Sequence, residues 1–164
     1  MLKNAYFAGG CFWCITPIFK IYDVIAVVVG YSGGTEENPT YQLVKSQKTK
    51  YRETLEISYD DESVSYDKLL EIYLANVDPY DPEGQYIDKG YSYTLAIYYN
   101  DGNEKQKAIQ AIEKLKQQSN KEVHISVEPF VNFYKAEEYH QDYYLKNPEA
   151  FEKELIESGR KKVK

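Results

Sequence analysis

Cysteine is scarce in this chain of 164 residues: there are two, together with two histidines, one tryptophan and one methionine. So few thiols exclude a disulfide-rich scaffold, and both fall in one short stretch, "GGCFWC" at residues 9–14. A structural zinc site needs four ligands, and His124 and His140 stand far apart in the sequence. We therefore predict no metal site.

Long apolar runs and an excess of positive charge are also lacking. No segment approaches the ~18 consecutive apolar residues of a membrane span, and the first residues lack the long apolar core of a signal peptide. The net charge is −6 and the pI is about 5.1, without a basic stripe, which argues against nucleic-acid binding. We expect a cytoplasmic protein with no membrane and no nucleic-acid partner.

The pattern of apolar residues predicts strands separated by helices. Without an internal repeat or a linker, the chain is most simply one domain, 1–164, with a frayed tail from about residue 155. We predict an α+β fold, a ferredoxin-like sandwich whose mixed or antiparallel sheet is covered by helices, with long functional loops such as 78–90. The predicted strands are 4–10, 24–29, 51–60, 93–100 and 122–130, and the predicted helices are 11–22, 41–47, 65–77 and 103–118.

Two cysteines three positions apart are open to several interpretations. Cys11 and Cys14 could bind metal, pack as structural thiols in the core, or form a redox pair. We favour the redox pair because Cys11 stands where a strand gives way to a helix. Backbone N–H groups at a helix start stabilise a thiolate, so this position predicts a lowered pKa for Cys11. Pro17 predicts either a kink or a helix start near Cys14.

Segments along nearly the whole chain resemble, in the same order, the type A peptide methionine sulfoxide reductases. The resemblance begins at "GGCFWC", where the thiol nucleophile of that family lies. It continues at "GYSGG" (30–34), "NPTY" (38–41), "ETLEISYD" (53–60), "SYDKLLEIYLANVDP" (65–79), "GQYIDKGYSY" (84–93) and "AEEYHQDYYLKNP" (136–148).

The resemblance implies an enzyme that reduces the S-epimer of methionine sulfoxide, free or in proteins, to methionine and so repairs oxidative damage. Cys11 matches the nucleophile, which becomes a sulfenic acid. Phe12 and Trp13 match the aromatic wall that receives the S-methyl group. Many relatives carry a further cysteine in a glycine-rich C-terminal tail, but this chain has none there, so Cys14 is the candidate resolving thiol. Thioredoxin or another dithiol would reopen the disulfide, without metal or organic cofactor.

The remaining roles concern the sulfoxide oxygen, which must be protonated or strongly hydrogen-bonded before its sulfur becomes electrophilic. Glu53 matches the acid, and burial of a carboxyl would hold it neutral for that task. Tyr41 and Tyr93 match the hydroxyls near the oxygen, and Asp88 matches a supporting polar residue. His140 lies in a recurrent family segment, and we expect a structural role for it. We expect a monomer.

Some positions depart from the family pattern and leave two other functions open. Lys50-Tyr51 replaces Gly-His before the acid, Thr16 stands where an acidic residue is frequent, and Val77 replaces a common histidine. A thioredoxin-like oxidoreductase of protein disulfides is the generic alternative for Cys-x-x-Cys. A catalytically silent sensor that binds oxidised methionine peptides is the other.

Overall fold

A computed structural model describes residues 1–157 of the chain. Residues 155–157 complete the last helix, and the rest of the predicted frayed tail lies outside the described residues. The elements are β1 (Leu2–Gly9), α1 (Phe12–Lys20), β2 (Ala26–Ser32), α2 (Tyr41–Lys45), β3 (Arg52–Asp60), α3 (Tyr66–Ala75), β4 (Gly84–Gln85), β5 (Asp88–Lys89), the short 3₁₀ helix η1 (Tyr91–Tyr93), β6 (Leu95–Tyr99), α4 (Gly102–Gln117), β7 (Ile125–Pro129), β8 (Tyr134–Lys135), the 3₁₀ helix η2 (Glu138–His140), α5 (Tyr143–Lys146) and α6 (Pro148–Glu157).

One sheet of six strands, in the order β7-β6-β1-β3-β2-β8, forms the centre of the molecule. The succession β1-α1-β2-β3-α3-β6 is the ferredoxin-like β-α-β-β-α-β arrangement, and its four strands pair antiparallel in the order β6-β1-β3-β2. β7 then joins β6 in parallel, which makes the sheet mixed. The predicted α+β class and sheet type are confirmed.

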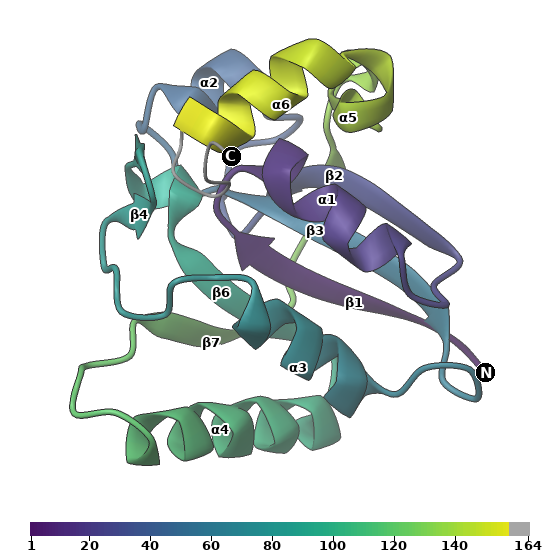
Figure 1. Cartoon of the computed structure of the whole chain (residues 1–164), viewed down its shortest axis with the longest axis vertical. Coiled ribbons are helices and arrows are strands. Elements are labelled where there is room, and N and C mark those ends of the chain that lie inside the picture. The colour runs from purple at the N-terminus through teal and green to yellow at the C-terminus, as the bar shows by residue number, and fades with distance from the viewer. Residues whose placement is uncertain (158–164) are drawn as a thin grey trace.

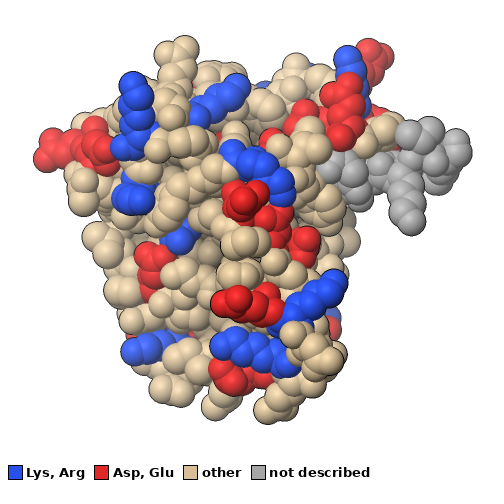
Figure 2. All heavy atoms as spheres, turned by 90° about the vertical axis from the view of Figure 1, so that its left-hand side faces the viewer, with Lys and Arg blue, Asp and Glu red and all other residues tan. Residues whose placement is uncertain are grey.

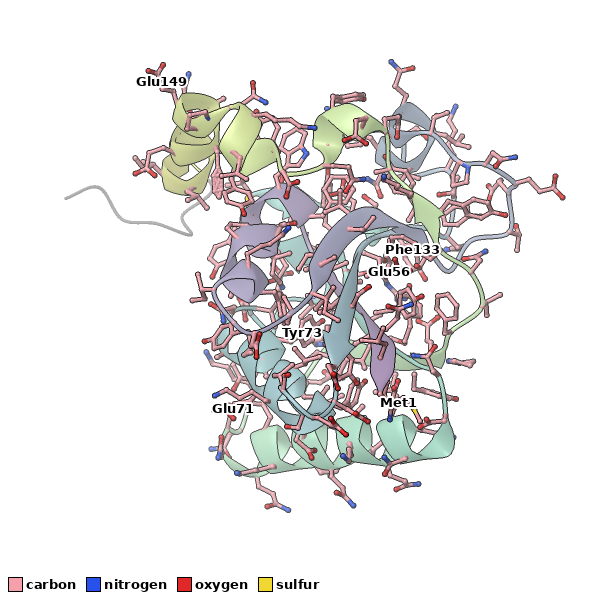
Figure 3. All side chains as sticks on the ribbon, turned by 90° about the vertical axis from the view of Figure 1, so that its right-hand side faces the viewer. Met1, Glu56, Glu71, Tyr73, Phe133 and Glu149 are labelled. Carbon is pink, nitrogen blue, oxygen red and sulfur yellow. The ribbon has the colours of Figure 1, made fainter. Side chains whose placement is uncertain are left out.

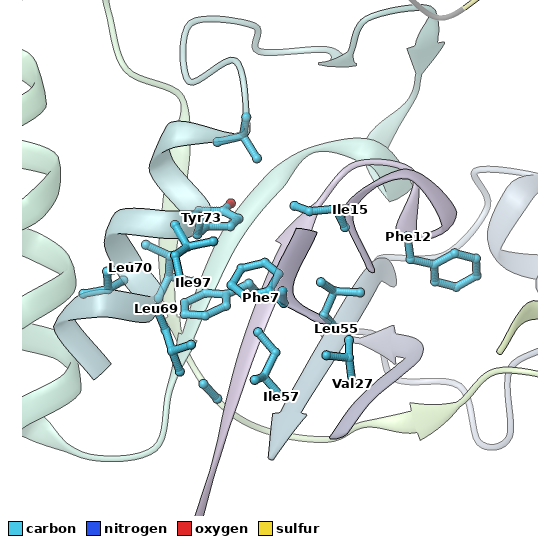
Figure 4. Packing of buried hydrophobic residues seen from close by; sticks show 14 of the residues in the cluster. Phe7, Phe12, Ile15, Val27, Leu55, Ile57, Leu69, Leu70, Tyr73 and Ile97 are labelled. Atoms are coloured by element: carbon cyan, nitrogen blue, oxygen red, sulfur yellow. The ribbon is translucent and has the colours of Figure 1, made fainter. Parts of the chain in front are cut away.

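Helices α1 and α3 cover one face of this sheet (Figure 1). Alternate side chains of the central strands, such as Phe7, Leu55 and Ile57, are fully buried against them (Figure 4). Tyr73 of α3 points into this layer (Figure 3), stacks on Phe7 with ring centroids 5.0 Å apart, and donates a hydrogen bond to the carbonyl of Ala8 at 2.6 Å. These contacts fix the end of β1 directly before Cys11.

The opposite face of the sheet carries a smaller aromatic cluster. Tyr6 stacks on Phe130 at 4.0 Å and contacts Phe133, which lies in the segment that leads from β7 to β8 (Figure 3). The face of the molecule in Figure 2 carries basic and acidic side chains in alternation, without a large area of one sign. Within residues 1–157, no helix combines the length and the apolar character needed to cross a bilayer.

The first helix begins at Phe12 and passes through Pro17, close to the predicted range 11–22, so of the two alternatives given for Pro17 the start near Cys14 is wrong. Two glycines make the earlier start possible. Gly10 has φ +85°, a left-handed conformation that reverses the chain after β1. A Cβ atom on Gly9 would lie 2.5 Å from the Cδ1 atom of Ile15, so a larger residue at this position would force the Ile15 side chain to shift.

Candidate active site

Cys11 lies at the turn between β1 and α1 and is 6% exposed. Its carbonyl accepts a hydrogen bond from the backbone N–H of Cys14 at 3.2 Å, which closes the first turn of the helix. Both thiols are free and buried. The sequence therefore places the nucleophile by local means, through the glycine turn and the start of α1.

A largely enclosed cavity of about 210 Å³ opens beside this turn. Parts of the chain that are distant in sequence line it: the start of α1, α2, β3, β5, η1 and α6. Every predicted nucleophile, acid and substrate-binding residue is among its lining residues, which are Cys11, Phe12, Trp13, Tyr41, Lys45, Glu53, Asp88, Tyr93 and Glu154. The predicted resolving residue, Cys14, lies one turn along α1 and outside this list.

Glu53 stands near the start of β3 and is only 2% exposed. Its Oε1 atom accepts a hydrogen bond from the backbone N–H of Phe12 at 3.1 Å. Burial raises the pKa of Glu53 to about 8, and the nearby Asp88 carboxylate adds to the rise, while the Phe12 N–H opposes it. The carboxyl is therefore mainly protonated at neutral pH, as a proton donor to the cavity must be.

The pKa of Cys11 is raised well above its ordinary value, which corrects the prediction of a lowered one. The largest cause is the Cys14 side chain hydrogen-bonded beside it, followed by burial and by the Glu53 and Asp88 carboxyls. The start of one short helix cannot outweigh these effects, because the N–H groups at a helix terminus stabilise a nearby negative charge by only about 0.3–1 kcal/mol. The resting nucleophile is thus a thiol.

The aromatic wall is held in place by residues close to the C-terminus. The indole Nε1–H of Trp13 donates a hydrogen bond to Nδ1 of His140 at 2.9 Å, across 127 residues of sequence. The indole ring also stacks on Tyr143 at 4.1 Å, and Phe12 lies 5.2 Å from the His140 ring. Burial lowers the pKa of His140 to about 4, so Nδ1 is free to accept at neutral pH. The geometry agrees with a structural role for His140.

The two predicted hydroxyl donors reach the cavity from separate elements. Tyr41 begins α2, and its backbone N–H donates a hydrogen bond to Oε2 of Glu137 at 3.1 Å. The Oε1 atom of Glu137 accepts a hydrogen bond from the Tyr31 hydroxyl at 2.8 Å. Tyr93 ends η1, after the β4–β5 turn that presents Asp88. Burial, with the Glu53 carboxyl nearby, raises the pKa of both Tyr41 and Tyr93, so both keep their protons.

Cys14 lies between the nucleophile and a second hollow. Its side chain hydrogen-bonds to that of Cys11, and it lines a surface depression with Val77, Tyr86 and Phe151 among its neighbours. The two sulfur atoms are thus adjacent before any oxidation. A thiol in this place can reach an oxidised Cys11 with only a local adjustment of the first turn of α1.

The departures from the family pattern take up ordinary packing positions. The Thr16 hydroxyl donates to the carbonyl of Phe12 at 2.6 Å within the helix. Tyr51 is fully buried and its hydroxyl donates to the carbonyl of Glu36. Val77 lines the depression beside Cys14. None of them replaces a lining residue of the cavity.

Three residues of the site were not predicted from the sequence: Lys45, Glu137 and Glu154. Lys45 follows Tyr41 by four positions in α2. This spacing places both side chains on one face of a helix, so it could have indicated that Lys45 lies beside Tyr41. Glu137 and Glu154 carried no such signal, because each reaches the site only through the path of the chain after β7.

The structure also groups three atoms of types that bind metal ions. The Cys11 sulfur and carboxylate oxygens of Asp88 and Glu154 all lie within 4.8 Å of one another. One thiol and two carboxylates without histidine are not a typical structural zinc set. The absence of a metal site stays a prediction.

Comparison with known proteins identifies the family of this chain. The family model described as peptide methionine sulfoxide reductase matches residues 3–164. Peptide methionine sulfoxide reductase MsrA 2 of Staphylococcus aureus is 44% identical over 162 residues, which cover 97% of this chain and 92% of the relative.

Solved structures agree in fold. Reduced Mxr1 from Saccharomyces cerevisiae matches with a TM-score of 0.86 at 28% identity, over 90% of this chain and 87% of Mxr1. Methionine sulfoxide reductase A of Corynebacterium diphtheriae matches with a TM-score of 0.83 at 29% identity, over 90% of this chain and 76% of that protein. The chain belongs to the peptide methionine sulfoxide reductase family.

Proposed function

We propose that this chain reduces the S-epimer of methionine sulfoxide to methionine in the cavity between Cys11 and Glu53. The observation that carries the proposal is the pairing of a buried thiol with a carboxyl that is neutral at pH 7, in one cavity with an aromatic wall. A sulfoxide has an apolar methyl group beside a strongly polar S=O. Phe12 and Trp13 suit the methyl group, and Glu53 suits the S=O group.

In the first step the sulfoxide oxygen takes the proton of Glu53, while the Tyr41 and Tyr93 hydroxyls hold the oxygen by hydrogen bonds. The Cys11 sulfur bonds to the sulfoxide sulfur, and its own proton passes to the Glu53 carboxylate. The S–O bond of the substrate then breaks as the hydroxyl passes to the Cys11 sulfur, and the new sulfur–sulfur bond breaks to release methionine. The thiol and the sulfoxide have become a sulfenic acid and methionine, and Glu53 is protonated again. Asp88 supports the polar side of the cavity.

In the second step the Cys14 thiol attacks the sulfenic acid, which releases water and leaves a Cys11–Cys14 disulfide. A dithiol then reduces this disulfide by exchange and is itself oxidised to a disulfide. We assign that part to thioredoxin. Mxr1 of yeast has been solved in complex with Trx2, in a structure that matches this chain with a TM-score of 0.58. The cycle uses no metal and no organic cofactor.

The arrangement of the cavity supports a choice between the two epimers. The methyl group, the oxygen and the rest of the side chain each need a different wall, and the sulfur must face Cys11. Only one configuration at sulfur meets all these demands together. The protein acts as a monomer in the cytoplasm, a reducing compartment that the free thiols of Cys11 and Cys14 suit.

One assay tests the function. The protein is combined with thioredoxin, thioredoxin reductase and NADPH, and NADPH consumption is followed with the S- or R-epimer of methionine sulfoxide. Turnover on the S-epimer alone is the expected result. Turnover on protein disulfides without any on sulfoxide would make the chain a dithiol oxidoreductase. Tight binding of oxidised peptide with neither activity would make it a sensor.

A further inference from the structure

Tyr93 reaches the cavity from η1, a single 3₁₀ turn of three residues. The backbone of this turn is closed by a hydrogen bond from the Tyr93 N–H to the carbonyl of Gly90 at 3.0 Å, and by one from the Thr94 N–H to the carbonyl of Tyr91 at 3.0 Å. One helical turn is unstable by itself, because it fixes several dihedral angles for each hydrogen bond that it gains. The position of the Tyr93 hydroxyl therefore depends on the contacts that η1 makes with the rest of the protein.

The side-chain amide of Gln47, which follows α2, holds the middle residue of η1. Its Oε1 atom accepts a hydrogen bond from the backbone N–H of Ser92 at 3.0 Å, and its Nε2 atom donates one to the Ser92 hydroxyl at 2.8 Å. Ser92 is only 1% exposed, so Gln47 provides the partners that water would provide elsewhere. Gly90 allows this close approach, since a Cβ atom there would lie 2.6 Å from the Cδ atom of Gln47.

The backbone of Gln47 has a conformation that favours glycine. Its φ is +65°, in the left-handed region, where a Cβ atom makes the conformation unfavourable. Glycine at this position would relieve that strain, but it would also remove both hydrogen bonds to Ser92. The contacts with η1 give a physical reason for the side chain at this position, which the turn itself does not.

The guanidinium group of Arg52, the first residue of β3, contacts the residues on either side of Ser92 and Tyr93. Its Nε atom donates a hydrogen bond to Oγ1 of Thr94 at 2.8 Å, and its central carbon lies 4.6 Å from the centroid of the Tyr91 ring. Its Nη1 atom donates to Oε2 of Glu128 at 2.6 Å. Arg52 is 6% exposed, so these contacts fix the guanidinium group against the end of the sheet.

Gln47 and Arg52 both belong to the segment 46–52, which leads from α2 into β3. This segment connects Tyr41 at the start of α2 with Glu53, which directly follows Arg52. Its contacts with η1 therefore set the place of Tyr93 relative to the two other groups that meet the sulfoxide oxygen. The Tyr93 hydroxyl also forms a hydrogen bond with the Tyr41 side chain, so the two hydroxyls lie together.

We propose that Gln47 and Arg52 are positioning residues of this reaction, which hold η1 against the segment 46–52 and so place the Tyr93 hydroxyl at the sulfoxide oxygen. The inference rests on the proposed function, since it concerns the same oxygen. Neither residue is among those that line the cavity, so both act through η1. Loss of their contacts should lower the rate of S–O bond cleavage more than it weakens substrate binding.

The main test replaces Gln47 with glycine, which adopts the left-handed backbone without strain. Gln47→Gly should lower the maximum rate of single-turnover methionine release from the S-epimer about fivefold to tenfold, as the loss of one neutral hydrogen bond does. The substrate concentration that gives half the maximum rate should change by less than about twofold, because Tyr93 assists the transition state more than it binds the substrate.

Two further variants check the reason for this effect. Gln47→Glu should keep the wild-type rate, because a carboxylate can accept hydrogen bonds from both the N–H and the hydroxyl of Ser92. Gln42→Ala is the matched control. Gln42 is an exposed glutamine of α2, and this variant should behave as wild type.

A double-mutant cycle separates the positioning of Tyr93 from a general loss of structure. Tyr93→Phe removes the hydroxyl, so Gln47→Gly should then slow the reaction no further. In a Tyr41→Phe background the same substitution should keep its full effect, because the Tyr93 hydroxyl is still there to be displaced. Arg52→Lys keeps a positive charge beside Glu128 but loses the planar group that contacts η1, and it should follow the same pattern.

Three outcomes overturn the inference. The first is a Gln47→Gly variant that releases methionine at the wild-type rate. The second is an equal slowing by Gln47→Gly with and without the Tyr93 hydroxyl, and the third is a Tyr93→Phe variant as fast as wild type. Failure of the proposed function is distinct from all three, because then the wild-type protein releases no methionine from the S-epimer.

Discussion

The backbone N–H of Phe12 donates a hydrogen bond to Oε1 of Glu53 at 3.1 Å, in the interior of the protein. This contact joins the first residue of α1 to the start of β3, so the residue after the nucleophile also orients the acid. The free oxygen of the carboxyl is then available to the cavity. Burial holds the pKa of Glu53 at about 8, although the Phe12 N–H favours the ionised form.

Glu53→Gln should slow the first chemical step by about 10²–10⁴-fold, the usual effect of losing a general acid. Wild-type single-turnover sulfide release should also fall as the pH rises through about 8, because Glu53 then loses the proton that it donates. The glutamine variant should show no fall at that pH. Release at the wild-type rate in this variant would remove Glu53 from the mechanism.

The same substitution should stabilise the fold at alkaline pH. The raised pKa of Glu53 means that folding disfavours the ionised carboxyl, so the wild-type protein loses stability as the pH rises from about 4.5 to about 8. Glutamine keeps a similar shape without the charge. Urea unfolding at pH 5 and pH 9 should show a gain for Glu53→Gln that is small at pH 5 and on the order of 3–5 kcal/mol at pH 9. An equal difference at both pH values would contradict a raised pKa.

Cys14→Ala should lower the pKa of Cys11, because the Cys14 side chain is the largest cause of its rise. The measurement is the rate of iodoacetamide alkylation of Cys11 against pH in the variant and in the wild type, with peptide mapping to separate the two thiols. The midpoint of the variant should lie at lower pH. An unchanged midpoint would assign the rise to burial and the neighbouring carboxyls alone.

Cys14→Ser should leave the first step intact and block recycling by thioredoxin. The variant should release about one equivalent of methionine per enzyme and then stall as a Cys11 sulfenic acid, which dimedone traps. Cys11→Ser is the control, and it should release none because a hydroxyl is a much weaker nucleophile near neutral pH. Full turnover of Cys14→Ser with thioredoxin would show that an external thiol attacks the sulfenic acid directly.

His140→Phe should raise KM more than it lowers the single-turnover rate, because it removes the acceptor that holds the Trp13 indole. The partly buried Nε1–H then has no side-chain partner at this position, which costs on the order of 1 kcal/mol of stability. Trp13→Ala removes the wall itself and should raise KM further. His140→Asn, which offers a carbonyl acceptor, should recover part of the binding. Equal KM values for wild type and His140→Phe would show that stacking on Tyr143 suffices.

The sequence by itself determined the features that depend on neighbouring residues or on periodicity. The two glycines before Cys11 give the strand-to-helix turn, Ser65 caps α3, and the apolar pattern yields the α+β order of elements. The resemblance to the family named seven of the lining residues of the cavity, but not Lys45 or Glu154. These predictions succeed because backbone conformation and amphipathic patterning are local properties.

Only the tertiary structure decided the properties that depend on distance and burial. The Cys11 pKa is raised, whereas the helix start alone predicts a lowered one. Desolvation and the side chains of Cys14, Glu53 and Asp88 outweigh the helix start. Lys45 and Glu154 enter the cavity through the packing of α2 and α6 around it. Electrostatic energies depend on separation in space and on contact with water, and neither can be read from separation along the chain.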